Sequence, residues 1–342
     1  MHEDREHVGA TEQTVTESKA LRTTRGTTSI AGFLERYGIL VAWLVVIVVF
    51  SILAPTTFPT VANFDTIAST QAVLLIMTLG LLLPLAAGEF DLSVGATMGF
   101  APIVVGYLNV FHHWPIVPAV AVALLAGIGF GAFNALLIVR LGVPSLIATL
   151  GSGTLLTGLG YGLSNSETIG GISNGLINFA TWPIGGLPLS FLYAIAITVL
   201  IWYVLEHTPF GRYLFFVGEG REVARLAGLP VNPLRTISLI SGAFVVTVAG
   251  VLQAGTVGAA DPTVGVSYLL PTFAGAFLGA TAIRPGRFNA WGSLIAVYFL
   301  VTGITGLELL GYSGWVQQIF YGGVLIIAVA LGRITQNRRA VQ

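Results

Sequence analysis

Ten long apolar stretches fill the sequence after Tyr37, and only short polar gaps separate them. A helix needs about 20 apolar residues to cross the roughly 30 Å hydrocarbon core of a bilayer. Since backbone polar groups in lipid must bond within the segment, these stretches predict membrane-spanning helices and not open sheet. The predicted spans lie at 38–54, 66–87, 92–109, 116–138, 144–163, 188–205, 236–258, 266–283, 290–306 and 314–332. We therefore predict an all-α fold, a polytopic membrane helical bundle of about ten transmembrane helices.

The composition agrees with lipid as the main solvent. Only 9% of the 342 residues are charged, whereas soluble domains average about 25%. So few charged side chains cannot cover a water-facing surface, which excludes a soluble enzyme. Fifteen Lys and Arg balance fifteen Asp and Glu, so no basic face is left for nucleic acid. The chain contains no cysteine, which excludes disulfide scaffolds and zinc or iron–sulfur sites built on Cys.

All the cationic residues fall on one side of the ten-span arrangement. The gaps at 55–65, 110–115, 164–187, 259–265 and 307–313 contain no Lys or Arg, whereas the tails and the remaining gaps contain all of them. Basic loops stay in the cytoplasm, so we predict that both termini are cytoplasmic and that the number of spans is even. Ten spans is the preferred number, and eight or nine spans with a re-entrant segment is the alternative.

Both ends of the chain differ in character from the spans. Residues 1–36 hold eleven of the thirty charges, are rich in Ser and Thr and contain no apolar run. This composition predicts a disordered cytoplasmic tail. The apolar stretches define a transmembrane domain over residues 37–333, and residues 334–342 form a second cytoplasmic tail. The longest predicted cytoplasmic gap, 206–235, lies inside the transmembrane domain.

The residues that membrane enzymes and ion-driven transporters need are missing. The only lysine, Lys19, lies in the N-terminal tail, so the chain has no P-loop to hold ATP. None of the five His lies within a predicted span, which argues against a metalloprotease and against a metal site. The spans carry almost no charge, so a proton relay is missing as well. We expect no enzyme activity, no cofactor and no metal in this chain.

Pairs of glycines four residues apart recur inside the spans. This spacing places two glycines on one helix face and lets a second backbone approach closely. It predicts helix packing in a tight bundle and carries no further functional assignment. The pairs are Gly95/Gly99, Gly127/Gly131, Gly158/Gly162 and Gly275/Gly279.

Two acidic residues lie near membrane depth, where the second and third spans are joined. Asp91 and Ser93 at the start of a span are typical of a helix N-terminus, where a carboxylate caps free backbone N–H groups. Ionisable groups at this depth are costly, so a gate or a broken helix beside a transport pathway is the alternative. Both interpretations single out Glu89, Asp91, Ser93 and Gly95.

The 206–235 gap contains a short amphipathic pattern. Residues 222–229 can form a helix whose two faces differ: Val223, Leu226 and Ala227 lie opposite Glu222 and Arg225. Gly228 supplies a C-terminal turn, and Pro230 stops the helix. The pattern fits either a solvated connecting helix or a docking knob for a cytoplasmic partner.

Three collinear stretches resemble the permease subunits of sugar-type ABC importers, the ribose/xylose/galactoside permease family. Residues 88–95 are similar to the family's Gly-Gly-Ile-Asp-Leu-Ser-Val-Gly, with Glu89 in place of the second glycine. Residues 134–151 are similar to another stretch of the family nearly in full. Residues 216–229 resemble its cytoplasmic coupling segment; they keep Gly218, Ala224, Arg225 and Gly228 and depart at Glu219, Gly220 and Val223. The resemblance covers residues 38–332.

The resemblance implies a multi-pass permease of the bacterial inner membrane that carries a monosaccharide or similar small polar solute by alternating access. The implied path runs between two permease copies, in a homodimer or with a paralogue. ATP and Mg²⁺ bind to a separate ATP-binding cassette subunit, and an extracytoplasmic solute-binding protein delivers the solute. The implied coupling residues are Gly218, Glu219, Gly220, Arg221, Glu222, Ala224, Arg225, Leu226 and Gly228.

One stretch departs from the family pattern. In much of the family the segment aligned with residues 268–287 carries acids soon after its Tyr and then a Gly-Gly-Arg-Gly turn. Here Leu269, Leu270 and Pro271 replace the acids, and Arg284-Pro285-Gly286-Arg287 replaces the turn. Because of this departure the resemblance does not identify the solute, although it still indicates the class of transporter. A secondary transporter or channel for a small neutral solute is the alternative, although it does not account for the arginine-bearing cytoplasmic helix.

Overall fold

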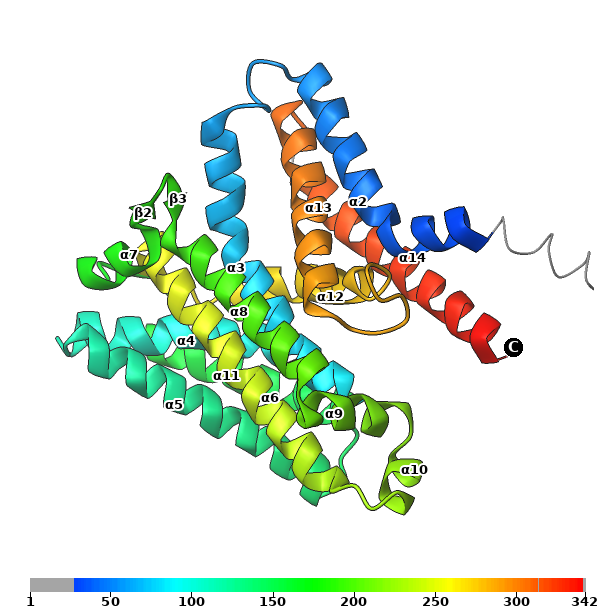
Figure 1. The fold of residues 1–342 in the computed structure, drawn as a ribbon. Coiled ribbons are helices and arrows are strands. Elements are labelled where there is room, and N and C mark those ends of the chain that lie inside the picture. The colour runs from blue at the N-terminus through cyan, green and yellow to red at the C-terminus, as the bar shows by residue number, and fades with distance from the viewer. Residues whose placement is uncertain (1–27, 313, 341–342) are drawn as a thin grey trace, which may run out of the picture.

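The computed structural model describes residues 28–312 and 314–340, with side chains over 36–312 and 314–330. Each of the ten predicted spans coincides with a helix in this part of the chain (Figure 1). Two of the helices continue as a π-helical turn, Tyr107–Phe111 (η1) after α4 and Leu136–Arg140 (η2) after α5. The ten helices are α2 Thr28–Leu53, α3 Val61–Ala86, α4 Val94–Gly106, α5 Ile116–Ala135, α6 Ser145–Ser164, α8 Leu189–His207, α11 Val231–Val257, α12 Val264–Gly279, α13 Ala290–Leu309 and α14 Trp315–Ala340.

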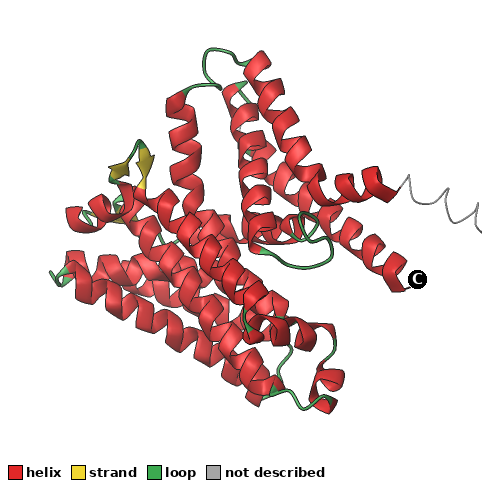
Figure 2. Cartoon of the chain, in the orientation of Figure 1, coloured by secondary structure: helices red, strands yellow, loops and turns green. Residues whose placement is uncertain are grey.

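The remaining elements are short and lie in the gaps between the long helices (Figure 2). Three of them are helices, α7 Asn174–Thr181, α9 Pro209–Glu219 and α10 Arg221–Leu226. The strands have two residues each and form two antiparallel pairs, β1 Ile169–Gly170 with β4 Ala259–Ala260 and β2 Pro183–Ile184 with β3 Leu187–Pro188. The predicted all-α membrane bundle is therefore confirmed.

Eight of the described helices are long and apolar enough to cross a membrane. The other two predicted spans correspond to shorter apolar helices, α12 and the Trp315–Ala330 part of α14. α12 has only 16 residues: it begins at Val264 and ends at Gly279, before the turn that contains Pro285 and Gly286.

The helices extend into both predicted tails. α2 begins at Thr28, so residues 28–36 are helical and not part of a disordered tail as predicted. Ile30, Phe33 and Leu34 recur at helical spacing there, which is the pattern of a helix and not of a polar linker. At the other end α14 continues to Ala340, through most of the predicted 334–342 tail. The rest of the predicted N-terminal tail, residues 1–27, lies outside the described residues.

α3 forms the centre of the bundle. Every residue from Ala72 to Ala87 is buried, as expected of a helix that is apolar on all sides. α8, α11, α12 and α13 pack around it. α11 comes closest: a methyl group on Gly80 of α3 would lie 3.0 Å from the carbonyl oxygen of Gly242 in α11. This close packing holds α3 and α11 rigidly against each other.

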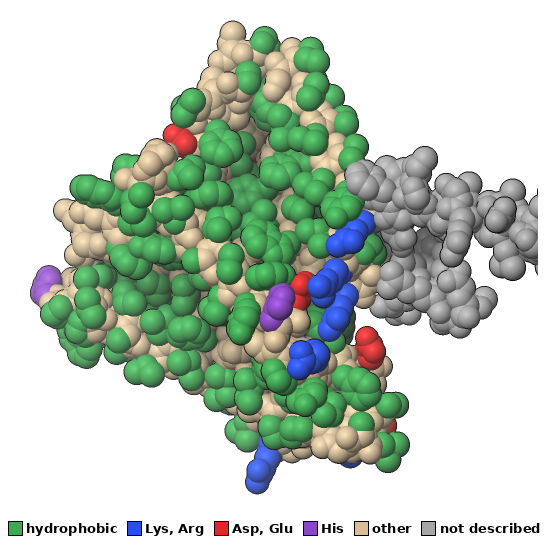
Figure 3. All heavy atoms as spheres, viewed as in Figure 1, with side chains coloured by type: hydrophobic (Ala, Val, Ile, Leu, Met, Phe, Trp, Pro, Cys, Tyr) green, Lys and Arg blue, Asp and Glu red, His purple; other side chains and the backbone are tan. Residues whose placement is uncertain are grey.

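The two predicted faces of the membrane are separated in the structure. β1 and β4 come from two gaps that carry no Lys or Arg, and they pair with each other. At the opposite side the backbone N–H of Ile283 donates to the carbonyl oxygen of Arg36, 2.9 Å away, which joins two arginine-bearing segments. In Figure 3 the visible Lys and Arg side chains gather along the lower right of the molecule, and the upper left shows none. This separation agrees with the predicted orientation.

Most of the predicted glycine pairs lie at helix crossings. Gly127 and Gly131 of α5 face α11, where a methyl group on Gly131 would lie 2.8 Å from the Cβ of Ala243. Gly275 and Gly279 of α12 face α13. Because a side chain would fill the space that the partner backbone occupies, these crossings depend on glycine.

Gly158 and Gly162 of α6 differ from the prediction. A methyl group on either one would meet nothing within 4 Å in the described chain. The packed face of α6 carries Ser152, Leu156 and Gly160, which recur every four residues. Residues 158 and 162 therefore point to the opposite side of the helix, and in this protomer they form no helix crossing.

The two kinds of glycine give a matched pair of variants. A methyl group on Gly279 would lie 2.5 Å from the backbone nitrogen of Ser293, so Gly279→Ala must push α12 away from α13. We expect a loss of about 1–3 kcal/mol in stability, as is usual for overpacked cores. Gly158→Ala should leave stability unchanged or slightly raised, because alanine favours the helix. Thermal unfolding of the detergent-purified variants measures both effects, and equal melting temperatures would contradict the crossing.

Candidate functional site

The segment from Gly88 to Ser93 joins α3 to α4 and lies against α6. Its first residue, Gly88, has φ +74°, a left-handed conformation that favours glycine. Two side chains of α6 bind its backbone: Ser145 Oγ accepts from the N–H of Phe90 at 3.3 Å, and Thr149 Oγ1 accepts from the N–H of Leu92 at 3.0 Å. The segment is thus held by hydrogen bonds that an apolar helix could not supply.

A buried chain of polar side chains continues from this segment into α5 and α6. Asp91 Oδ1 accepts from the backbone N–H of Ser93 at 2.9 Å and from its hydroxyl. Asn134 Nδ2 donates to Ser93 Oγ at 2.8 Å, and Ser152 Oγ donates to Asn134 Oδ1 at 2.6 Å. All four side chains are buried.

Asp91 binds the backbone just before α4 and does not cap the first turn of that helix. The helix begins at Val94, and the N–H group that Asp91 binds belongs to Ser93, just before it. The same local structure occurs ahead of α12, where Asp261 Oδ1 accepts from the N–H and the hydroxyl of Thr263, both at 2.8 Å. α12 then begins at Val264. Residues 91–95 and 261–265 are therefore two copies of one helix-start motif, Asp-x-Ser/Thr-Val-Gly.

The two helices that follow these motifs cross at their first turns. A methyl group on Gly95 would lie 2.7 Å from the carbonyl oxygen of Gly265, and one on Gly99 would lie 3.0 Å from the backbone nitrogen of Gly265. The predicted pair Gly95/Gly99 thus packs against the glycine of the second motif. Because the two backbones touch, the crossing of α4 and α12 has no room for a side chain between them.

Glu89 lies at the centre of an ion-pair cluster. Its carboxylate is buried, with 1% of the side chain exposed, and Oε1 accepts from Arg221 Nη2 at 2.8 Å and from Arg235 Nε. Arg221 belongs to α10, and Arg235 lies in the first turns of α11. Arg221 Nη2 also donates to the carbonyl oxygen of Gly88 at 3.3 Å. A single buried carboxylate thus connects the 88–93 segment to α10 and to α11.

A backbone contact reinforces this connection. Gly218, near the end of α9, lies against Gly88: a methyl group on Gly88 would lie 3.3 Å from the Cα of Gly218. In the reverse direction, a methyl group on Gly218 would clash with the carbonyl oxygen of Ala86. The predicted coupling loop and the predicted gate motif are therefore in direct contact.

α10, in the predicted coupling loop (residues 206–235), presents two apolar side chains to solvent. α10 covers residues 221–226, and Ala224 alone of these six is buried. Val223 is 61% exposed and Leu226 is 88% exposed. Arg225 forms an ion pair at 3.0 Å with Glu222 on the same exposed surface. Exposed apolar side chains beside charges are typical of a surface that binds a partner.

The other predicted coupling residues shape the loop. Glu219 ends α9, and Gly220 stands between α9 and α10 in an extended conformation. Gly228 has φ +77°, and a methyl group there would meet no atom of the described residues within 4 Å. It forms the predicted C-terminal turn after α10, and α11 begins at Val231, just after Pro230.

Two further contacts on the same side connect the end of α8 and α9 to the turn between α12 and α13. Arg284 Nη2 lies 2.9 Å from Glu206 Oε2, and the guanidinium of Arg287 lies 3.7 Å above the ring of Phe215. Both arginines belong to the turn in which the chain departs from the family pattern. α9 thus contacts both the 88–93 segment and the turn after α12, on the side predicted to be cytoplasmic.

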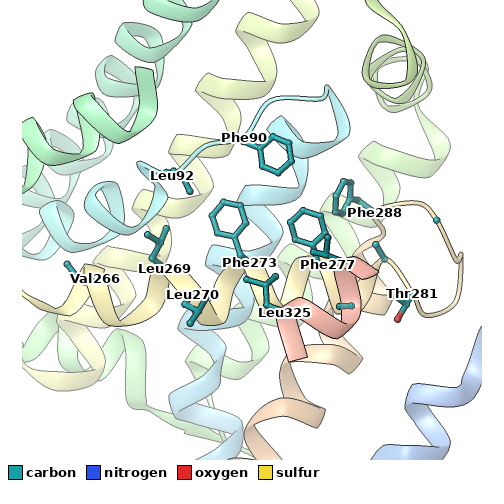
Figure 4. A pocket seen from close by; sticks show the side chains of 14 residues that line it. Phe90, Leu92, Val266, Leu269, Leu270, Phe273, Phe277, Thr281, Phe288 and Leu325 are labelled. Atoms are coloured by element: carbon teal, nitrogen blue, oxygen red, sulfur yellow. The ribbon is translucent and has the colours of Figure 1, made fainter. Parts of the chain in front are cut away.

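An apolar cavity of about 590 Å³ lies between the 88–93 segment, α12, the turn after α12 and α14. Figure 4 shows the rings of Phe90, Phe273, Phe277 and Phe288 around it. Phe90 stacks on Phe277 with ring centroids 6.3 Å apart, and Phe288 meets Phe277 edge-on at 5.5 Å. These four rings define what we name the aromatic cavity.

Sequence reasoning identified Glu89 and Arg221 separately but missed that they meet. It also did not single out Arg235, Asn134 or Ser152 as site residues. The position of Arg235 could have predicted an acidic partner, because a cation at the edge of a membrane span is costly unless it is paired. The repeated helix-start motif could have been found by comparing residues 91–95 with 261–265. Within the described residues, no three His, Asp or Glu gather closely enough to hold a metal ion.

Comparison with known proteins places these features in a family. The family model described as "Branched-chain amino acid transport system / permease component" matches residues 63–329. The ribose import permease protein RbsC of Escherichia coli K12 is 31% identical over 294 residues, which cover 85% of this chain and 91% of the relative. The D-allose transport system permease protein AlsC of the same organism is 26% identical over 307 residues, covering 90% and 94%.

A further relative is the autoinducer 2 import system permease protein LsrD of Klebsiella pneumoniae, 31% identical over 273 residues, covering 78% of this chain and 82% of the relative. No solved structure matches the chain. The predicted location is confirmed, since the chain is a multi-pass protein of the bacterial inner membrane. With the matched residues covering most of its length, the chain belongs to the family of branched-chain amino acid transport system permease components.

Proposed function

We propose that this protein is the permease subunit of an ABC importer and forms the path for a monosaccharide or similar small neutral solute. The names of its relatives, permeases for ribose, D-allose and autoinducer 2, support import of a small neutral compound. The observation that carries the coupling to ATP is the ion-pair cluster of Glu89, which connects the exposed α10 to the membrane-embedded 88–93 segment.

The proposed partners follow from this arrangement. An ATP-binding cassette subunit, which holds ATP and Mg²⁺, docks on the exposed side chains of α10. A second copy of the permease completes the translocation path, and an extracytoplasmic solute-binding protein delivers the solute. The chain itself carries out no chemistry on the solute.

In this proposal the mechanism is alternating access. Closure of the ATP-binding subunit pushes on α10, and the push reaches the 88–93 segment through Arg221 and Glu89 and through the contact of Gly218 with Gly88. The segment carries Phe90, so its movement changes the aromatic cavity on the cytoplasmic side. α4 pivots on α12 at the same time, because their first turns are in contact. ATP hydrolysis then resets the arrangement.

Arg225→Glu tests the docking role of α10. Arg225 is exposed and its pair with Glu222 contributes little to stability, so the variant should fold and insert normally. We expect it to abolish ATP-driven uptake, because it reverses the charge of the docking surface. The measurement is uptake of labelled D-ribose and D-allose by proteoliposomes that contain the permease, the solute-binding protein and the ATP-binding subunit.

Arg140→Glu is the matched control, since Arg140 is an exposed cytoplasmic arginine outside the coupling loop. It should retain uptake. Normal uptake by Arg225→Glu would refute the docking role. ATP-independent, vectorial uptake by the permease alone would instead favour the secondary transporter or channel.

A further inference from the structure

A second large cavity adjoins the aromatic cavity along α12. It measures about 860 Å³ and is lined by residues of α3, α6, α12, α13 and α14. This volume falls in the range of about 300–1,000 Å³ that small-molecule sites occupy. We name it the polar cavity, because ten of its sixteen lining residues carry polar side chains. In the aromatic cavity, Thr281 is the one lining residue with a polar side chain.

The chemistry of the lining selects a class of ligand. Amide groups come from Gln71, Gln317 and Gln318, hydroxyl groups come from Ser, Thr and Tyr, and Glu308 is the one charged lining residue. No lining residue is a cation, so a phosphate or carboxylate would find no partner. Amides, hydroxyls and one carboxylate supply the donors and acceptors that several hydroxyl groups need.

Some of these groups have no partner inside the protein. The side chains of Glu308 and Gln318 form no hydrogen bond to another described residue, whereas the Ser267 hydroxyl donates only to the carbonyl oxygen of Val264. Polar groups that lie between membrane helices are costly unless water or a ligand satisfies them. The cavity is therefore expected to hold water when empty and hydroxyl groups when filled.

The position of the cavity fits the start of a transport path. Thr263 stands before α12, Glu308 lies near the end of α13 and Gln317 lies near the start of α14. These positions adjoin gaps that are predicted to face away from the cytoplasm. Val266 and Leu270 line both the polar and the aromatic cavity. One face of α12 thus separates a polar outer compartment from an apolar inner one.

We propose that the polar cavity is the outward-facing binding site for a neutral, polyhydroxylated and unphosphorylated solute. The proposal rests on the transport function proposed above and names the place and chemistry of solute recognition. Solute enters among the amides of α3 and α14, and Val266 and Leu270 stand between it and the aromatic cavity. Movement of α12 relative to α4 opens the way between the two compartments.

The absence of native cysteine makes the proposal directly testable by single-cysteine labelling. Ser267→Cys and Thr305→Cys each place a thiol in the lining of the polar cavity. We expect a membrane-impermeant methanethiosulfonate reagent, added from the outside, to modify both. The thiolate is the reactive form and requires water, so labelling reports a hydrated cavity that is open to the outside.

Two further variants calibrate the labelling rate. Thr168→Cys lies in an exposed loop beside β1 and should react fastest. Ser51→Cys lines a separate cavity of about 500 Å³ with mostly apolar walls between α2, α3, α8 and α13, and it should not react. If the two cavity thiols react no faster than Ser51→Cys, the polar cavity is not an outward-facing site and the proposal is wrong.

Protection by solute then tests the ligand class. Erythritol, D-ribose, D-allose, D-galactose, myo-inositol and ribose 5-phosphate are added at saturating concentration before the reagent. We expect at least one neutral compound to slow labelling of Ser267→Cys severalfold without slowing Thr168→Cys, and we expect ribose 5-phosphate to have no effect. Protection by no compound, or by the phosphate alone, would overturn the proposal. Since labelling needs no ATP-binding subunit, its outcome is separate from that of the uptake experiment.

Discussion

Glu89→Ala is expected to unfold well below the melting temperature of the parent protein and to lose ATP-driven uptake. The change leaves Arg235 with only 10% of its side chain exposed and no anionic partner among the described residues. Breaking a buried ion pair by removing one partner costs about 3–5 kcal/mol, a large part of the stability of most domains. Thermal unfolding of the detergent-purified protein measures the loss.

Two further variants separate stability from coupling. Glu222→Ala removes a carboxylate that is 80% exposed and should change stability by less than about 1 kcal/mol. The double variant Glu89→Leu with Arg235→Met replaces the buried pair by apolar side chains and should recover much of the lost stability. Uptake should stay low, because Arg221 still lacks its partner. Unfolding of Glu89→Ala at the parent temperature would show that the cluster is not a structural link.

Gly218→Ala is expected to abolish ATP-driven uptake although it adds only one methyl group. The methyl group would clash with the carbonyl oxygen of Ala86, and backbone atoms cannot move aside as the end of a flexible side chain can. α9 must therefore shift away from the 88–93 segment and carry α10 with it. Overpacking of this kind costs about 1–3 kcal/mol, so the protein should still insert while its coupling to ATP hydrolysis is lost.

Gly220→Ala is the matched control for this change. It lies two residues further along, and the nearest atom to a methyl group there is Val223 Cγ2 at 3.7 Å, an ordinary contact. It should retain uptake. The measurement is uptake together with solute-stimulated ATP hydrolysis in proteoliposomes, and normal coupling in Gly218→Ala would mean that α9 and the 88–93 segment move independently.

The helices of this protein could be predicted because lipid imposes a simple rule on the sequence. The backbone N–H and C=O groups of each apolar stretch must form hydrogen bonds within that stretch. Length and hydropathy are therefore enough to place α3, α8 and α13 within a few residues. The same rule does not cover helices that are shorter than a span or lie among charges. The α9 helix was missed because its 11 residues are too few to cross a bilayer. Residues 28–36 were assigned to a tail because the composition of residues 1–36 as a whole is polar and charged.

The site could be predicted in parts but not as an assembly. Glu89 and Arg221 were each recognisable, but they are 132 residues apart, and Arg235 is 146 residues from Glu89. Which charges meet depends on how α3, α10 and α11 pack, and local pattern does not contain that information. The glycines show the same limit: spacing finds the pair Gly158/Gly162 on one face of α6, but only the packed structure shows where that face points.

The crossing of α4 and α12 at Gly95 and Gly265 has a thermodynamic consequence. The crossing joins α4, which follows the 88–93 segment, to α12, whose Ser267 lines the polar cavity. In the proposed mechanism, a solute that prefers one position of α12 also changes the affinity of α10 for the ATP-binding subunit, because α10 contacts the 88–93 segment through Glu89. Linkage requires the reverse effect to be equal, so partner binding changes solute affinity by the same factor. The two faces of the membrane would thus share a single coupling free energy, measurable from either side.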